Sequence, residues 1–240
     1  MKSDLTKLQR VLGYTFQDPK LLTEALMHRS FASENNLRYD NQRLEFLGDS
    51  VLQIVLTEFI FQRYTDYAEG PMTKIRSAMS DQTALAILAR KINLGEYLLL
   101  GRGEIENDGG NRDSTLSDAL ESVFAAIYLD GGLEPARTVI LRLMEEAFPR
   151  PEDLLLTNNP KGALQEFSQK YYGVSPIYQT LSVEGEDHDP LFTVQVSLQD
   201  VVLATATARK RKTAEGIAAG HAITLLKEGK IPGLQEKKEG

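Results

Sequence analysis

Four carboxylates fall into two pairs whose spacing could build one metal site. Glu45 and Asp49 lie four residues apart, and Asp118 and Glu121 lie three residues apart. In helices, these spacings place both members of a pair on one face. Like charges one turn apart repel, so stability alone would favour a lysine at one position. Each pair therefore indicates a bound cation, and two such helices side by side would gather all four carboxylates.

The available ligand types favour a hard cation. The sequence contains no cysteine, and none of its three histidines lies at a metal-ligand spacing from another. Mg²⁺ prefers oxygen ligands, keeps several waters and bridges phosphate oxygens. Such a site can activate a water, orient a phosphate and stabilise a leaving oxyanion. The expected reaction is metal-dependent phosphodiester hydrolysis without a side-chain nucleophile.

Chance offers an alternative explanation, because acidic pairs at these spacings are common on surface helices. Both pairs lie beside apolar residues expected to belong to a core, which favours the metal site. Glu69 could supply a fifth carboxylate, although an isolated glutamate before Gly70 and Pro71 is more often solvated. His28 is interpreted as a structural residue rather than a ligand.

Two long helices must position the carboxylates. The first is predicted over residues 41–64, where Leu44, Leu47, Val51, Leu52, Val55 and Phe59 recur at helical spacing. Gly48 lies inside it, where glycine costs about 1 kcal/mol relative to alanine. Such a glycine usually allows another backbone or a ligand to come close. The second helix is predicted over residues 115–130, and the glycine pair after it ends it.

Other parts of the first half are also expected to be helical. The predicted helices cover residues 4–12, 18–28, 72–91 and 134–147, with a short segment near 92–98. Residues 101–113 are polar and rich in glycine, so an irregular exposed loop is expected there. It could be a solvated connection or could face a substrate. No β pattern appears before residue 150.

The pattern changes after residue 148. Residues 149–159 contain prolines and are predicted to be a linker. The elements predicted after it are a helix over 161–172, strands over 176–183, 190–198 and 201–208, and a helix over 210–228. The expected fold class is an all-α domain over 1–148 followed by a small α-β-β-β-α domain over 160–230, with 231–240 as a disordered tail.

Four consecutive basic residues, 209–212, begin the last predicted helix. Positive charges there oppose the helix dipole, so they are expected to serve an external anion. A phosphate would gain from the cations and from the free backbone N–H groups. A solvated basic patch is the alternative. The net charge of the whole chain is −7, which argues against a nucleic-acid partner, so local clustering must decide.

Composition excludes several classes of protein. The 240 residues are 42% hydrophobic and 25% charged, as in ordinary globular proteins. The absence of cysteine excludes disulfides and thiolate metal sites and fits a reducing compartment. The N-terminus lacks the apolar core of a signal peptide, and no apolar run approaches the roughly 20 residues that cross a membrane. The expected location is the cytoplasm, with no membrane partner.

Residues 43–52, RLEFLGDSVL, resemble the signature of bacterial ribonuclease III. The match covers residues 5–148 and includes LLTEALMHRSFA, GEYLLLGRGE, DALE and AIYLDGG. The resemblance implies an all-helical catalytic domain that dimerises and cuts double-stranded RNA with Mg²⁺. It assigns catalysis and metal binding to Glu45, Asp49, Asp118 and Glu121, with Glu69 as a further metal or RNA contact.

Assembly, products and cofactors are also implied by this resemblance. Phe46 is expected to pack across a homodimer interface, although it could be an ordinary core residue. The products would carry 5′-phosphate and 3′-hydroxyl ends with short 3′ overhangs, and the substrates would be precursors of ribosomal and messenger RNA. Mn²⁺ is expected to replace Mg²⁺, and no small-molecule cofactor is expected. Many relatives have an acidic residue where this chain has Gln42, which puts an auxiliary metal or water contact in doubt.

Residues 160–228 resemble a double-stranded-RNA-binding domain. Leu164-Gln165-Glu166 and Arg211-Lys212-Thr213-Ala214-Glu215 carry the similarity, whereas the loop Gly185-Glu186-Asp187-His188 lacks the family's proline. The resemblance implies that the shape of an RNA duplex is recognised through two minor grooves and the phosphates between them. The implied RNA contacts are Gln165, Glu166, His188, Arg211 and Lys212, with Lys210 as a helper.

Two other functions stay open. One is a non-catalytic double-stranded-RNA-binding protein with a degenerate nuclease domain, and the other is a metal-dependent phosphohydrolase of small molecules. Four intact carboxylates argue against the first, and the second domain argues against the other. The prediction is a homodimeric, Mg²⁺-dependent endoribonuclease for double-stranded RNA.

Overall fold

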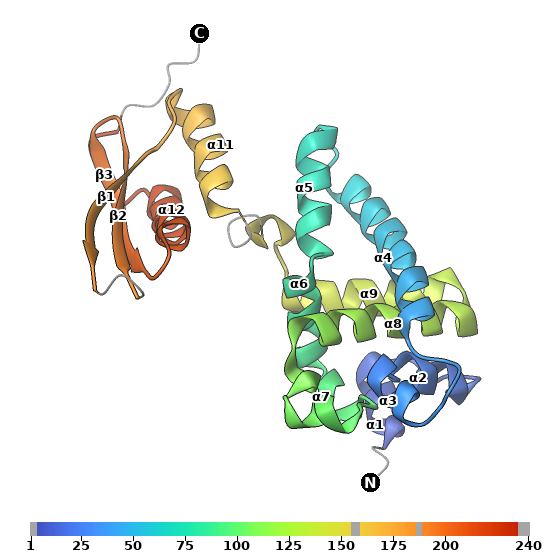
Figure 1. The fold of residues 1–240 in the computed structure, drawn as a ribbon. Coiled ribbons are helices and arrows are strands. Elements are labelled where there is room, and N and C mark those ends of the chain that lie inside the picture. Colours follow the sequence, from blue (N-terminus) through green and yellow to red (C-terminus); the bar gives the residue numbers. More distant parts are fainter. Residues whose placement is uncertain (1–3, 155–158, 186–188, 235–240) are drawn as a thin grey trace. The chain divides into compact units, whose positions relative to one another are not determined.

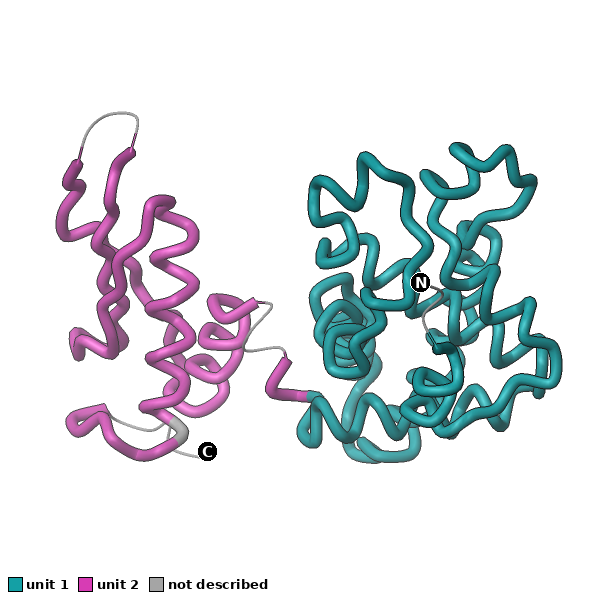
Figure 2. The backbone as a smooth tube through the Cα atoms, turned by 90° about the horizontal axis from the view of Figure 1, so that it is seen from below, with its two compact units in different colours: residues 1–151 teal, residues 152–240 magenta. Residues whose placement is uncertain are grey.

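The computed structural model describes residues 4–154, 159–185 and 189–234 (Figure 1). The chain divides into two compact units, residues 1–151 and residues 152–240 (Figure 2). The first unit is built from helices, and the second contains a three-stranded sheet with helices. None of the helices in the described ranges combines the length and the apolar character that a bilayer crossing requires.

Local sequence signals set the helix ends of the first unit. Its α-helices are α1 (Leu5–Leu12), α2 (Pro19–Ala25), α3 (Arg29–Glu34), α4 (Gln42–Arg63), α5 (Glu69–Met79), α6 (Gln82–Lys91), α7 (Arg102–Glu106), α8 (Asp113–Gly131) and α9 (Leu133–Ala147). Its short 3₁₀ turns are η1 (Leu94–Tyr97) and η2 (Gly109–Asn111), and a third, η3 (Pro151–Asp153), spans the end of the first unit and the start of the second. Asp18 caps α2 by accepting a hydrogen bond from the backbone of Lys20. Gly13 ends α1 with a φ of +66°.

Helix α8 forms the centre of the first unit. It packs against α2, α4, α6 and α9 (Figure 1). Leu120, Val123 and Phe124 are completely buried, as is most of the helix between them and its C-terminal turn. A helix that is apolar on nearly every side is stable only when other elements surround it. The sequence of α8 therefore fixes its central place in the fold.

Gly48 allows the backbones of α4 and α8 to approach closely. A Cβ atom built on Gly48 would overlap the backbone carbonyl of Glu121. This contact explains why a residue that weakens its own helix stands there, and it confirms the close approach predicted from the sequence. It also brings the segment that carries Glu45 and Asp49 against the segment that carries Asp118 and Glu121.

The helix predicted over residues 72–91 is wrong in one respect, because the structure divides it into α5 and α6. Ser80 ends α5, and the side chain of Asp81 caps α6 by accepting a hydrogen bond from the Ala84 N–H at 2.7 Å. The apolar period continues across the junction, so periodicity alone does not reveal the break. The cap decides where the new helix begins.

Two further predictions need correction. The helix predicted over 18–28 ends earlier, at Ala25, and His28 caps the separate helix α3. Residues 101–113 do not form an irregular loop throughout, because α7 and η2 lie within them. Both corrections concern helices of six residues or fewer, whose apolar pattern is too short to detect.

The second unit is an antiparallel sheet with helices packed on it. Its strands β1 (Ile177–Glu184), β2 (Leu191–Leu198) and β3 (Val201–Ala208) follow the order β1-β2-β3, and its helices are α11 (Pro160–Tyr172) and α12 (Arg211–Lys227). Helix α12 packs against β2, β3 and α11 (Figure 1). The predicted α-β-β-β-α order is confirmed. Gln199 and Asp200 have φ values of +49° and +65°, as the tight turn between β2 and β3 requires.

The core of the second unit lies between the sheet and its helices. It contains Leu164, Val196, Leu198, Leu203, Ala206, Ala218, Ala219, Ala222, Ile223 and Leu226. Alanines on α12 let the helix lie close to the strands. Ile231 and Leu234 also pack against this core, whereas residues 235–240 lie outside the described ranges.

Replacing Gly48 with alanine should destabilise the first unit, although alanine is the better helix former. The added Cβ must push α4 away from the Glu121 carbonyl, so we expect a loss of the order of 3 kcal/mol in the free energy of unfolding. Gly70→Ala in α5 is the matched control, because a Cβ there meets no atom within 4 Å. Urea denaturation monitored by circular dichroism measures both. Equal stability of the two variants would contradict the close contact.

Candidate active site

Three of the four predicted carboxylates meet where α4 packs on α8. Glu45, Asp118 and Glu121 each offer one carboxylate oxygen, and these three oxygens lie within 4.8 Å of one another. Glu45 comes from the first turn of α4, and the other two come from one face of α8. All three side chains are partly buried. We call these three residues the carboxylate group.

Asp49 lies beside the carboxylate group rather than within it. Its charge acts on Glu121, but none of its oxygens belongs to the set within 4.8 Å. Gln53 Nε2 donates to Asp49 Oδ1 at 3.3 Å and to Ser80 Oγ at 3.1 Å. Gln53 thereby holds the Asp49 side chain and connects α4 to the junction between α5 and α6.

The pKa of Glu121 shows how unfavourable its negative charge is in this place. Burial is the largest cause that raises this pKa, and the charges of Asp49, Asp118 and Glu45 raise it further, to about 8. Burial disfavours the ionised form because the side chain loses water, and nearby carboxylates add repulsion. Without a cation, Glu121 therefore keeps its proton near neutral pH.

The pKa values of the other two members of the carboxylate group are also raised. Burial, then the charges of Asp118 and Asp40, raise the pKa of Glu45. Burial raises the pKa of Asp118, and it outweighs the opposing hydrogen bond from Ser117 and the opposing charge of His28. The cluster thus holds negative charge at a cost, which a cation would remove.

This arrangement fits a divalent metal ion. The three nearest donors are carboxylate oxygens, which suit Mg²⁺ and Mn²⁺. A bound divalent ion reverses the local preference for protonation, because its charge favours the ionised carboxylates. Glu45, Asp118 and Glu121 would hold the ion, with Asp49 next to it.

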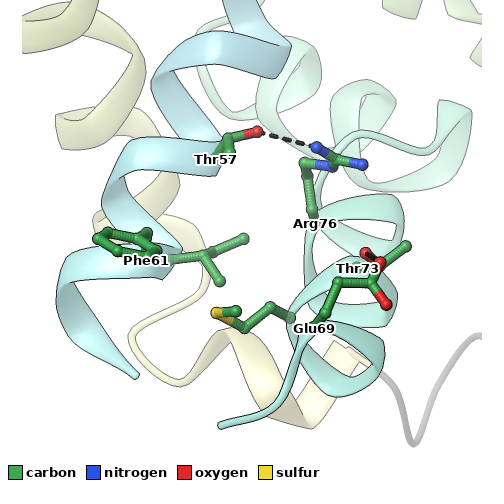
Figure 3. Close-up of a pocket in the computed structure, with 7 residues that line it drawn as sticks. Thr57, Phe61, Glu69, Thr73 and Arg76 are labelled. Atoms are coloured by element: carbon green, nitrogen blue, oxygen red, sulfur yellow. Dashed lines mark hydrogen bonds between the residues drawn. The ribbon is translucent and has the colours of Figure 1, made fainter. Parts of the chain in front are cut away.

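Glu69 lies in a different pocket of the first unit. Figure 3 shows it with Thr57, Phe61, Thr73 and Arg76 around a pocket between α4 and α5. The volume of this pocket is about 200 Å³. Glu69 Oε1 accepts a hydrogen bond from Thr73 Oγ1 at 2.8 Å, and Arg76 Nη1 donates to Thr57 Oγ1 at 3.0 Å. Within one copy of the chain, the structure does not bring Glu69 into the carboxylate group.

A larger pocket of about 360 Å³ adjoins the carboxylate group. Its lining residues are His28, Arg29, Ser30, Ser33, Asn41, Gln42, Glu45, Glu104 and Asp118. We call it the adjoining pocket. Gln42 lies on the side of the carboxylates, where the sequence places it. The whole set comes from four separate stretches of chain.

Among the lining residues of the adjoining pocket, only Gln42, Glu45 and Asp118 are predicted from the sequence to lie at the site. His28 is interpreted from the sequence as structural, and Glu104 is only one of several polar residues in an expected loop. In the structure, both residues line the adjoining pocket together with Asp118. Glu104 also forms an ion pair with Arg112 at 2.9 Å. No local signal identifies these positions, because their proximity arises from contacts between distant segments.

The predicted RNA contacts that the structure describes lie on α11 and at the start of α12. Gln165 and Glu166 are exposed on α11, and Lys212 is exposed in the first turn of α12. Lys210 is the residue that precedes this turn. His188 lies outside the described residues.

Arg209 and Arg211 of the basic cluster 209–212 contact carboxylates within the described residues of the second unit. Arg209 pairs with Asp189 at 3.2 Å, and Arg211 Nε contacts Glu215 Oε1 at 2.9 Å. Lys161 Nζ contacts the other oxygen of Glu215 at 2.5 Å. Glu215 is buried, and the hydrogen bonds from Lys161 and Arg211 lower its pKa. The basic cluster is therefore partly neutralised within the fold.

Comparisons with known protein families match both units. Residues 18–147 match the family described as Ribonuclease-III-like, and residues 160–226 match the double-stranded RNA binding motif. The first match contains the carboxylate group, and the second contains the sheet with α11 and α12.

Individual relatives agree with these families over nearly the full chain. A protein named Ribonuclease 3 from a Nitratiruptor species is 41% identical over 223 residues, which cover 93% of this chain and 97% of that protein. The Ribonuclease 3 of Syntrophobacter fumaroxidans is also 41% identical and covers 92% of this chain and 94% of its own. The nuclease domain of ribonuclease III from Campylobacter jejuni superposes with a TM-score of 0.58 at 42% identity, covering 61% of this chain and 99% of its own. The chain therefore belongs to the ribonuclease III family of endoribonucleases.

Proposed function

We propose that this ribonuclease III family enzyme uses Mg²⁺, held by the carboxylate group, to hydrolyse phosphodiester bonds of double-stranded RNA. The observation that carries the proposal is the approach of Glu45, Asp118 and Glu121 to within 4.8 Å. The match of the second unit to the double-stranded RNA binding motif supports the substrate class. Mn²⁺ has the same preference for oxygen ligands and should replace Mg²⁺.

Each residue of the site has a separate role in hydrolysis. Glu45, Asp118 and Glu121 bind the ion, and Asp49, oriented by Gln53, adds a further acceptor beside it. When bound, the ion supplies an activated water and offsets negative charge on the phosphate. Hydrolysis that breaks the P–O3′ bond leaves 5′-phosphate and 3′-hydroxyl ends. We propose structured precursors of ribosomal and messenger RNA as the substrates.

The surface of α4 supports a homodimer. Phe46 is 80% exposed, and Ile54 and Phe61 are exposed on the same helix. Their spacings of eight and seven residues place them on one side of α4. The nuclease domain from Campylobacter jejuni is described with a flexible region involved in dimer formation. A second copy that covers this apolar stripe would form a dimer with two carboxylate groups. Each group would cut one strand of the RNA duplex, and the two staggered cuts would leave short 3′ overhangs.

The second unit is proposed to recognise the duplex by its shape. Gln165 and Glu166 on α11 would face a minor groove, and Lys210, Arg211 and Lys212 would face the phosphates. The exposure of α11 at these positions and of the first turn of α12 supports this assignment. The role of His188 stays a prediction.

Glu121→Gln should abolish cleavage and leave RNA binding largely intact. Removing one of three carboxylates should cost more than the roughly 100-fold that follows the loss of an outer-shell partner. Cleavage of a perfect RNA duplex in Mg²⁺ and a binding assay without Mg²⁺ measure the two effects. Glu145→Gln, at an exposed position of α9, is the matched control. If the wild-type protein binds the duplex and never cuts it, the protein is a binding module and the proposal fails.

The stability of the metal-free protein should depend on Glu121 and on pH. The pKa of Glu121 rises from 4.5 to about 8 on folding. The contribution of its protonated form to the free energy of unfolding is therefore fully present below pH 4.5 and is lost as the pH rises through 8. Glu121→Gln cannot ionise, so its Tm should exceed that of the wild type above pH 8 and match it at pH 4.5. Because solvent screens the charge of Glu121, we expect the variant to exceed the wild type by about 1 kcal/mol in the free energy of unfolding above pH 8. This difference corresponds to a Tm that is higher by roughly 2–4 °C.

Calorimetry in EDTA measures this difference, and adding Mg²⁺ provides the control. The ion should raise the Tm of the wild type more than that of the variant, because it binds the ionised carboxylates of the folded state. A variant that is less stable than the wild type at both pH values would contradict the raised pKa.

Binding of duplex RNA should weaken steeply with salt. Each phosphate contact releases a counterion, so Lys212→Ala should reduce the slope of log affinity against log salt by about one. Lys230→Ala is the control, because Lys230 already pairs with Glu228 at 2.8 Å and should change the slope less. Fluorescence anisotropy over a series of salt concentrations checks both. Affinity that stays flat between low and physiological salt would rule out phosphate contacts.

A further inference from the structure

The backbone fixes His28 beside the start of α4. The His28 N–H donates to the Leu99 carbonyl at 3.0 Å, next to the isolated bridge between Met27 and Leu99. The carbonyl of Met27 accepts a hydrogen bond from the Asn41 N–H at 2.9 Å. Two distant segments thus hold the backbone around His28, and one of them contains Asn41, which directly precedes α4.

A network around Ser30 fixes the side-chain tautomer of His28. The Ser30 backbone N–H donates to His28 Nδ1 at 3.3 Å, and Ser30 Oγ lies 2.8 Å from the same nitrogen. Ser30 Oγ accepts the Gly101 N–H at 2.8 Å, so its own proton can point to His28. A ring nitrogen that accepts hydrogen bonds carries no proton. We assign the neutral ring, on this network, as a donor at Nε2.

The adjoining pocket is lined by both hydrogen-bond donors and carboxylates. His28, Arg29, Ser30 and Ser33 line it together with Glu45 and Asp118. Because His28 and Asp118 both line this pocket, the ring and the carboxylate border the same space. A phosphodiester has two non-bridging oxygens. If one of them faces the ion at the carboxylate group, the other needs a donor from the protein.

We propose that His28 donates a hydrogen bond from Nε2 to a non-bridging oxygen of the RNA phosphodiester bound over the carboxylate group. This contact orients the phosphate between the donors and the carboxylates of the adjoining pocket. The inference deepens the proposed function and rests on it. It gives His28 two tasks, since one ring nitrogen caps α3 and the other binds substrate.

Two substitutions separate these tasks. His28→Asn keeps a side-chain acceptor suited to capping α3, but its amide is too short to reach the position of Nε2. His28→Gln extends an amide donor toward that position and caps poorly. We expect His28→Asn to keep the wild-type Tm and lose about 10- to 100-fold in cleavage of duplex RNA, and His28→Gln to lose less activity despite a lower Tm. The opposite order, with Asn active and Gln inactive, would show a capping role only and overturn the proposal.

Thio-substituted RNA tests the contact directly. Sulfur accepts hydrogen bonds weakly, so replacing the oxygen that His28 contacts should slow the wild type and leave His28→Asn nearly unaffected. Replacing the other non-bridging oxygen should slow both proteins. Equal sensitivity of the two proteins to both diastereomers would overturn the proposal.

Controls distinguish this inference from the proposed function. His221→Asn, at an exposed position of α12, is the matched histidine control and should cleave at the wild-type rate. If the wild type fails to cut duplex RNA, the proposed function fails. If the wild type cuts and His28→Asn cuts equally well, only the assignment of His28 fails.

Discussion

The contact between Gly48 and the carbonyl of Glu121 is the constraint on which the first unit depends. A side chain at position 48 would separate α4 from α8, and the carboxylates of the two helices would then lie apart. Because α8 is buried among four other helices, it cannot shift to restore the contact. The site is therefore as rigid as the core beneath it, and its geometry is set by packing rather than by loops.

The same contact makes the site electrostatically costly. It brings carboxylates together in a partly buried place, where lost hydration and mutual repulsion both favour protonation. The apolar packing around α8 offsets this cost, and neighbouring groups moderate it: Ser117 and His28 act on Asp118, and Gln53 holds Asp49. The buried apolar residues of α8 thus stabilise the fold, whereas the carboxylates on one face of the same helix lower its stability. This combination is expected for a preorganised ion-binding site.

Features with a regular period or a specific local signal could be predicted from the sequence. The long helix around Glu45, the central helix around Glu121 and the alternating strands of the second unit all follow such patterns, and Gly48 stands out as an ill-placed residue in a helix. The division between α5 and α6 could not be found in this way, because a single capping residue, Asp81, overrides a continuous apolar period. His28 and Glu104 depend on tertiary contacts, and so does the place of Asp49 beside the other carboxylates rather than among them.

Glu215 changes what the basic start of α12 can do. It binds Arg211 and Lys161 through its two oxygens, so part of the positive charge there is cancelled when seen from afar. At close range the exposed guanidinium of Arg211 still presents N–H donors, and its contact with the buried Glu215 orients it. Long-range attraction for any polyanion is therefore weaker than the count of basic residues implies, while contact with a surface of matching shape is preserved.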